Sequence, residues 1–192
     1  GGAAAFRVNC VQCHGSGAGG SQELGYPNLN DDDWLWGGDL KAIHYTLTHG
    51  IRQPGDPDTR ASQMPPFAGA FDSSQLDDLV DHVLSLSGKA DASQAGAQLF
   101  ADNCAACHGS KGFGNRELGA PDLSDAIWLR GNSREAIKHQ ILEPRMGMMP
   151  KWEGRLDPVT IKMLAAYVHS LGGGEDFLEV AANPEVKVDE QP

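Results

Sequence analysis

The sequence has little of the material that a compact 192-residue protein normally uses for its core. Hydrophobic residues make up 40% and aromatic residues 7%, whereas glycine occurs 24 times. No run of 18 or more apolar residues predicts a membrane-spanning helix, and no signal segment opens the chain. Basic residues are scarce, 15 against 26 acidic ones, and a net charge of −11 argues against nucleic acid as a partner. We expect a soluble chain whose core contains something besides side chains.

Cysteine is also scarce, and all four cysteines fall into two identical C-x-x-C-H motifs. A disulfide framework would leave the histidines without a role, and a thioredoxin-like motif needs a βαβ context that is missing here. A zinc site expects cysteine pairs about 15–20 residues apart, whereas these pairs are 94 residues apart. C-x-x-C-H is the attachment signature of c-type haem. The motifs predict two haem c groups, bound through Cys10, Cys13 and His14 and through Cys104, Cys107 and His108.

The spacing of the motif suits this chemistry. Positions i, i+3 and i+4 share one face of a helical turn, so two thiols and an imidazole can address one porphyrin edge and its iron. The thiols would form thioethers with the haem vinyl groups, and His14 and His108 would be the proximal iron ligands. Because c-type haem is attached outside the cytoplasm, we expect the chain to reside in the bacterial periplasm.

The chain contains an internal duplication. At an offset of 94 residues, Phe6 through Gly37 matches Phe100 through Gly131 at many positions, and after a nine-residue length difference the offset becomes 85. Strand signals are nearly absent. We therefore predict an all-α fold with two tandem class I cytochrome c-like domains, residues 1–88 and 89–174, followed by a flexible acidic tail at 175–192.

The duplication also selects the sixth iron ligands. Apart from those in the motifs, none of the seven histidines has a histidine at the equivalent position, whereas Met64 and Met149 are equivalent and each precedes a proline. A thioether is a soft neutral donor, and Met/His ligation raises the haem potential above that of bis-histidine ligation. We predict Met64 and Met149 as iron ligands, with Met146 and Met148 as rivals to Met149.

A proline-containing loop follows each motif at the same distance. A ligating imidazole normally donates its second N–H to a carbonyl or carboxylate, which fixes the ring. The backbone carbonyls of Pro27 and Pro121 are therefore predicted to accept hydrogen bonds from His14 and His108. A plain turn is the alternative role for these loops.

Cap and stop signals predict three helices in each repeat. Asp39 is an expected N-cap, Asp157 precedes a proline at the first helical position, and Asp91 with Gln94 forms a capping-box pattern. The expected helices cover residues 2–13, 39–48, 73–86, 95–107, 133–142 and 158–171.

Beyond the haem motifs, the runs at residues 27–38, 48–52, 64–67 and 149–152 make the chain similar to the diheme subunit of cbb3-type cytochrome c oxidase, the CcoP/FixP family. The resemblance covers roughly residues 1–172. It implies electron transfer from a donor cytochrome c, through two haems, to the monohaem subunit and the oxygen-reducing catalytic subunit. No catalysis by this chain itself is implied. Such subunits carry an N-terminal membrane anchor, so this chain would be a soluble part on the periplasmic side of the inner membrane.

The negative charge is unevenly distributed. Residues 1–88 contain four basic and eleven acidic residues, residues 89–172 contain ten and nine, and the remaining tail contains one and six. An acidic first domain could attract a basic donor cytochrome, or could simply keep the chain soluble. The loop at 53–63, which has no counterpart in the second repeat, is either a docking loop or a plain insertion.

Other functions remain open on the sequence alone. A free periplasmic diheme carrier like cytochrome c4, or a diheme subunit of a dehydrogenase, would use the same chemistry. A diheme peroxidase or a gas-sensing haem protein belongs to a different class, because one of its haems needs an open or weakly bound sixth position.

Overall fold

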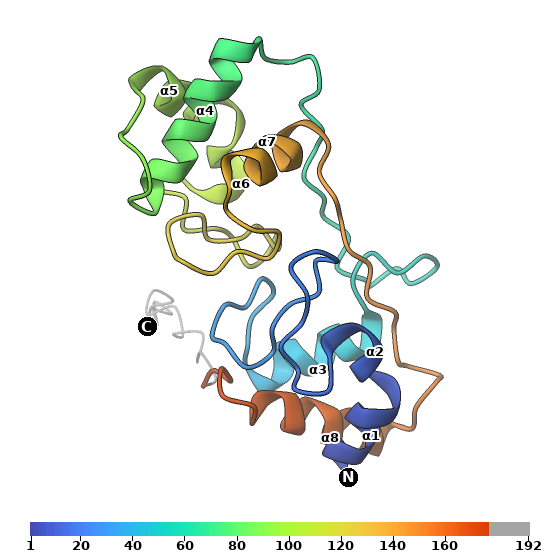
Figure 1. Cartoon of the computed structure of the whole chain (residues 1–192). Helices are drawn as coiled ribbons and strands as arrows, with labels where there is room; N and C mark the ends of the chain where they lie inside the picture. Colours follow the sequence, from blue (N-terminus) through green and yellow to red (C-terminus); the bar gives the residue numbers. More distant parts are fainter. Residues whose placement is uncertain (177–192) are drawn as a thin grey trace, which may run out of the picture.

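The computed structural model describes residues 1–176, which form eight helices and no strand, so the all-α prediction is confirmed for this part of the chain. The predicted acidic tail lies outside the described residues from position 177 onward. Figure 1 shows two lobes, which we call lobe 1 (α1, α2, α3 and α8) and lobe 2 (α4 to α7). The helices are α1 Gly2–Asn9, α2 Val11–His14, α3 Leu40–His49, α4 Ser73–Leu86, α5 Gln94–Asn103, α6 Ala105–His108, α7 Arg134–Leu142 and α8 Pro158–His169.

The first helix of each repeat differs from the prediction because it is interrupted at the first cysteine of the motif. Cys10 has φ −112° and ψ −24°, and Cys104 has φ −119° and ψ −33°, so each residue ends one helix and begins the next. A glycine with positive φ, Gly15 or Gly109, follows the short second helix. The motif therefore occupies a separate turn.

The helix caps agree with the sequence at two of the three predicted positions. Asp39 and Asp157 accept backbone N–H bonds at the starts of α3 and α8. The prediction for Asp91 is wrong, because the Ser93 hydroxyl caps α5 by accepting from the Gly96 N–H. Ser93 lies two residues closer to the helix and also donates to Asp78 on α4, which fixes its position.

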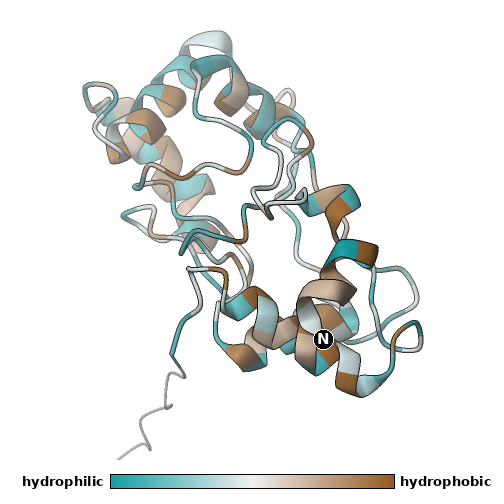
Figure 2. Ribbon diagram, turned by 60° about the horizontal axis from the view of Figure 1, so that its bottom comes forward, coloured by the Kyte–Doolittle hydropathy of each residue, from teal (hydrophilic) through white to brown (hydrophobic). Residues whose placement is uncertain are grey.

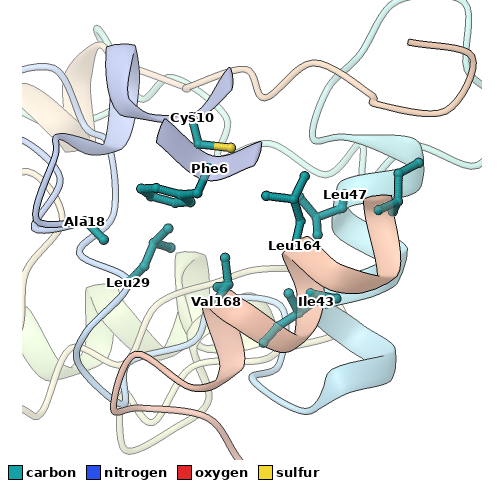
Figure 3. Packing of buried hydrophobic residues seen from close by; sticks show 10 residues of the cluster. Phe6, Cys10, Ala18, Leu29, Ile43, Leu47, Leu164 and Val168 are labelled. Atoms are coloured by element: carbon teal, nitrogen blue, oxygen red, sulfur yellow. The ribbon is translucent and has the colours of Figure 1, made fainter. Parts of the chain in front are cut away.

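The core of lobe 1 combines the beginning of the chain with its last helix. Figure 3 shows the side chains of Phe6, Cys10 and Leu29 gathered in one cluster with Leu164 and Val168 of α8. Phe6 is 1% exposed and Leu164 is fully buried. Since α8 belongs to the second repeat, this core joins residues about 160 positions apart.

Lobe 2 likewise combines helices of both repeats. Helix α4, from the end of the first repeat, packs on α5 and α7 of the second repeat. The buried residues of the lobe 2 core are Leu79, Val80, Val83, Leu84, Phe100, Ile137 and Ile141. Leu79 is equivalent to Leu164, and Phe100 to Phe6, so the two lobes have the same apolar layout.

The segments that connect the lobes run beside one another, as Figure 1 shows in teal and orange. Ile51 and Met149 exchange two backbone hydrogen bonds of 2.9 and 3.0 Å, and the Arg52 Nε donates to the Gly147 carbonyl at 2.6 Å. The last helix of each repeat, α4 or α8, is called its closing helix. The hydrophobic cores do not follow the predicted ranges 1–88 and 89–174, because lobe 1 contains α8 of the second repeat and lobe 2 contains α4 of the first. Leu79 and Val83 of α4 correspond to the identical Leu164 and Val168 of α8, whereas the buried Leu84 corresponds to His169.

Ion pairs between α4 and α7 favour this exchange. Arg134 and Lys138 on α7 pair with Asp81 and Asp77 on α4. If α7 packed instead on α8, the residue equivalent to Asp77 would be Lys162, which would meet Lys138 with the same charge. Like charges at a helix contact are destabilising. The charges therefore help to discriminate between two arrangements in which Leu79 and Leu164, and Val83 and Val168, are identical residues at equivalent positions.

Figure 2 shows hydrophobic and hydrophilic residues interspersed along each helix ribbon. Within residues 1–176, no helix combines the length and the apolar character needed to cross a membrane.

Candidate haem-binding sites

Each C-x-x-C-H motif places two free thiols on one short turn. Cys10 is buried and Cys13 exposed in lobe 1, while Cys104 is half-buried and Cys107 exposed in lobe 2. Burial, with a smaller contribution from the neighbouring thiol, raises the pKa of Cys10 to about 11, and the same causes raise the pKa of Cys104 to about 11. Reactive or zinc-binding thiols have lowered pKa values. The environment of Cys10 and Cys104 is therefore not that of a reactive thiolate.

The histidine of each motif contacts the proline loop that follows it. The Nδ1 atom of His14 lies 3.3 Å from the Pro27 carbonyl oxygen, and that of His108 lies 3.2 Å from the Pro121 carbonyl oxygen. A carbonyl can only accept, so each ring donates its Nδ1–H and keeps the Nε2 lone pair for a metal. Burial lowers the pKa of both histidines, and the carbonyl contact opposes it in part. Both imidazoles are thereby held neutral.

Two glycines that the sequence reasoning missed hold these loops in place. Gly20 and Gly114 donate backbone hydrogen bonds of 2.9 Å to the carbonyls of His14 and His108. Both have positive φ, and a Cβ on either one would overlap the backbone of the proline loop. Their equivalent positions in the two repeats were a usable signal.

The two predicted methionine ligands lie in the lobe opposite to their own repeat's motif. Met149, from the second repeat, packs against the core that contains Cys10. Met64, from the first repeat, packs against the core beside Cys104. The rivals Met146 and Met148 are 37% and 58% exposed and belong to neither core. Each lobe thus contains one C-x-x-C-H motif and one semi-buried Met-Pro segment.

The backbone holds both Met-Pro segments in the same way. The Trp152 N–H donates to the Leu47 carbonyl at 2.9 Å, and the equivalent Phe67 N–H donates to the equivalent Ile141 carbonyl at 3.1 Å. In each lobe, the segment after the methionine is therefore anchored to the end of a helix from the other repeat, α3 or α7.

The loop at 53–63 adds contacts that lobe 2 lacks. The Asp56 carboxylate, 2% exposed, lies 3.1 Å from the Lys151 Nζ and 3.3 Å from the His49 Nδ1. Burial raises the pKa of Asp56, but the hydrogen bonds from Lys151 and from the Asp58 N–H outweigh it, so the pKa is lowered overall. The Gln53 side chain accepts from the Lys151 N–H at 3.3 Å. This insertion binds the chain just after Met149.

The donor set fits a c-type haem in both lobes. Each lobe offers two unpaired thiols and a neutral imidazole with a free Nε2, and its core includes a thioether. Soft sulfur and imidazole donors are typical haem-iron ligands.

Comparison with known proteins identifies the family. The family described as cytochrome c oxidase, cbb3-type, subunit III, matches residues 1–83 and again 91–168, which confirms the tandem duplication. The chain is 55% identical over 179 residues to the cbb3-type cytochrome c oxidase subunit CcoP of Cereibacter sphaeroides. It is 55% identical over 177 residues to FixPc of Rhizobium leguminosarum and 52% identical over 177 residues to FixP of Rhizobium meliloti.

These alignments cover 91% of the chain and 61% of each relative, so the chain spans about three fifths of their length. Membership of this family implies covalently bound haem c. The family matches the chain twice, and the chain contains two equivalent sets of thiols, imidazole and thioether. The chain therefore belongs to the subunit III family of cbb3-type cytochrome c oxidases.

Proposed function

We propose that this chain transfers electrons through two haem c groups, from a donor cytochrome c toward the monohaem and oxygen-reducing subunits of a cbb3-type oxidase. The main supporting observation is that a C-x-x-C-H turn, a carbonyl-bound histidine and a Met-Pro segment occur together in each lobe. The bound haem iron would supply a one-electron couple. Nothing in this role requires a catalytic side chain.

The packing supports a crossed set of ligands. His14 would act with Met149, and His108 with Met64, because these pairs share a lobe. Cys10 and Cys13 would hold the first haem, and Cys104 and Cys107 the second. Pro27 and Pro121 orient the imidazoles through their carbonyls. Each site would then be complete only when both repeats are folded together.

The residues suit electron transfer better than ligand chemistry. A semi-buried methionine available in each lobe would keep the sixth iron position filled, which disfavours peroxidase or gas-sensing activity. Neutral methionine and neutral imidazole also raise the potential relative to bis-histidine ligation, as a carrier toward an oxidant needs. The proposal places the chain on the periplasmic side of the bacterial cytoplasmic membrane, within a membrane-anchored complex.

A spectroscopic comparison of the holoprotein tests this function. Haem content should be two per chain, the ferric protein should show the methionine-to-iron charge-transfer band of two haems, and the ferrous protein should not bind carbon monoxide. Met64→Ala and Met149→Ala should each remove half of the band, whereas Met148→Ala, at an exposed position, should leave it unchanged. Carbon monoxide binding by the unmutated protein would contradict the proposal and favour a sensor or a peroxidase.

A further inference from the structure

The contact between the lobes is built twice from equivalent positions. In lobe 1, Gly25 leaves room for the guanidinium of Arg130, because a Cβ there would overlap it. In lobe 2, the equivalent Gly119 leaves room for the ring of Trp36 in the same way. Trp36 and Arg130 are themselves equivalent, 94 residues apart. The two halves of this contact therefore differ in charge, because an arginine in one half replaces a tryptophan in the other.

Arg130 has no anionic partner among the described residues. Its Nε is buried without a hydrogen bond, and it forms no ion pair. Burial, and then the charge of Arg145, lower the pKa of Arg130, while burial and Arg130 itself lower that of Arg52. Arg52 donates only to carbonyls, those of Gly147 and Ser62. Three arginines thus concentrate uncompensated positive charge at one place.

This positive charge lies beside the attachment site of the first haem. Gly25, which Arg130 covers, directly precedes Tyr26 and Pro27, the loop that holds His14. The neighbouring Cys13 thiol is the largest cause of the raised pKa of the Tyr26 hydroxyl, and Arg130 acts on that hydroxyl in the opposite direction. Tyr26 therefore lies close to both the guanidinium and the thiol that would carry the haem.

The second haem site has an acidic surrounding instead. A cavity of about 520 Å³ is bordered by Pro121 and by the carboxylates of Asp33, Asp122 and Asp125. Burial, followed by repulsion from Asp125, raises the pKa of Asp33 to about 6, so the cluster remains anionic at neutral pH. Arg116 borders the same cavity but pairs with Glu175.

On the Trp36 side of the contact, Arg60 stacks on Trp36 with its Cζ 5.1 Å from the ring centroid. The carboxylate of Asp39 acts on the same guanidinium. Arg60 therefore differs from Arg130, which has no carboxylate beside it.

We propose that Arg130 of lobe 2 sets unequal reduction potentials by placing an uncompensated positive charge beside the first haem, so that this haem has the higher potential. A nearby cation stabilises the reduced, less positive iron centre, and nearby carboxylates do the opposite. The inference rests on the proposed binding of two haems. A residue of the second repeat would thus control the potential of the haem bound to the first motif.

A redox titration of the holoprotein, with the two haems resolved, tests this assignment. Arg130→Gln should lower the higher potential. The equilibrium constant for electron transfer between the two haems should change about tenfold, which corresponds to ~59 mV for one electron. Trp36→Arg should raise the lower potential instead. Arg130→Lys, which keeps the charge, should retain the separation even if the packing changes.

Lys162→Gln is the matched control, because it removes one exposed charge from α8 of lobe 1 away from the contact. Equal shifts in Arg130→Gln and Lys162→Gln, no shift in either, or a fall of the lower potential in Arg130→Gln would overturn the inference. A haem content other than two per chain in the unmutated protein would contradict the proposed function instead, so the two failures are distinguishable.

Discussion

Lobe 1 and lobe 2 share one apolar layout but are secured by different polar contacts. Lobe 1 uses the inserted loop, where Asp56 binds Lys151. Lobe 2 uses the ion pairs of α7 with α4, Arg134 with Asp81 and Lys138 with Asp77. Apolar residues at equivalent positions would allow each closing helix to pack on either lobe. The comparison teaches that in a duplicated chain the polar contacts, rather than the core, specify which halves assemble.

The strongest test of the exchange removes one buried leucine from each closing helix. Leu164→Ala and Leu79→Ala should each cost about 2–5 kcal/mol, because both side chains are fully buried and leave a cavity. Leu164→Ala should weaken methionine ligation at the His14 haem, and Leu79→Ala at the His108 haem, as read from the resolved charge-transfer bands during denaturation. Weakening at the haem of the mutated repeat itself would instead indicate that no exchange takes place.

A smaller effect is expected from Asp56→Asn, which acts on lobe 1 alone. The lowered pKa of Asp56 means that its stabilisation is present above the ordinary carboxyl pKa and is lost as the pH falls through the lowered value. Lobe 1 of the variant should therefore be less stable at neutral pH and should lose less stability on acidification. A thermal denaturation series from pH 7 to about 3 measures this, and Asp58→Asn, an exposed neighbour, is the control. Identical pH profiles for the variant and the unmutated protein would contradict it.

The smallest effect concerns the ion pairs of lobe 2. Lys138→Asp should lower the midpoint of chemical unfolding of lobe 2 slightly, because the Asp77 carboxylate would then face a like charge. The double variant Lys138→Asp with Asp77→Lys should restore only part of the loss, because the new lysine would also face Arg134, which lies 3.8 Å from the Asp77 carboxylate, and the difference should shrink in high salt. An unchanged midpoint in both variants would show that this pair does not help to select the packing partner.

Local features of the site were readable from the sequence. The C-x-x-C-H spacing predicts that the two thiols and the histidine share one helical turn, and equivalence between the repeats singles out Met64 and Met149. The hydrogen-bond geometry of His14 with Pro27 agrees with the general behaviour of ligating imidazoles. These inferences were possible because each depends on residues close together in the chain or on an exact repeat.

The partner of each closing helix could not be read from the same pattern. Leu79 and Leu164, like Val83 and Val168, are identical residues at equivalent positions, so hydrophobic periodicity fits both arrangements equally. The two arrangements are distinguished by charge, because Lys138 meets Asp77 on α4 and would meet Lys162 on α8, and by a few other positions such as Leu84 and its equivalent His169. The break of the first helix at Cys10 was missed because a continuous apolar pattern crosses it.

The crossed ligand set is tested most directly in a full-length chain that retains only the first haem. Cys104→Ala with Cys107→Ala removes the second attachment site, and Met149→Ala or Met64→Ala is then added. With crossed ligands, Met149→Ala abolishes the methionine-to-iron charge-transfer band of the remaining haem, while Met64→Ala leaves it intact. Loss of the band in Met64→Ala, with its retention in Met149→Ala, would contradict the account.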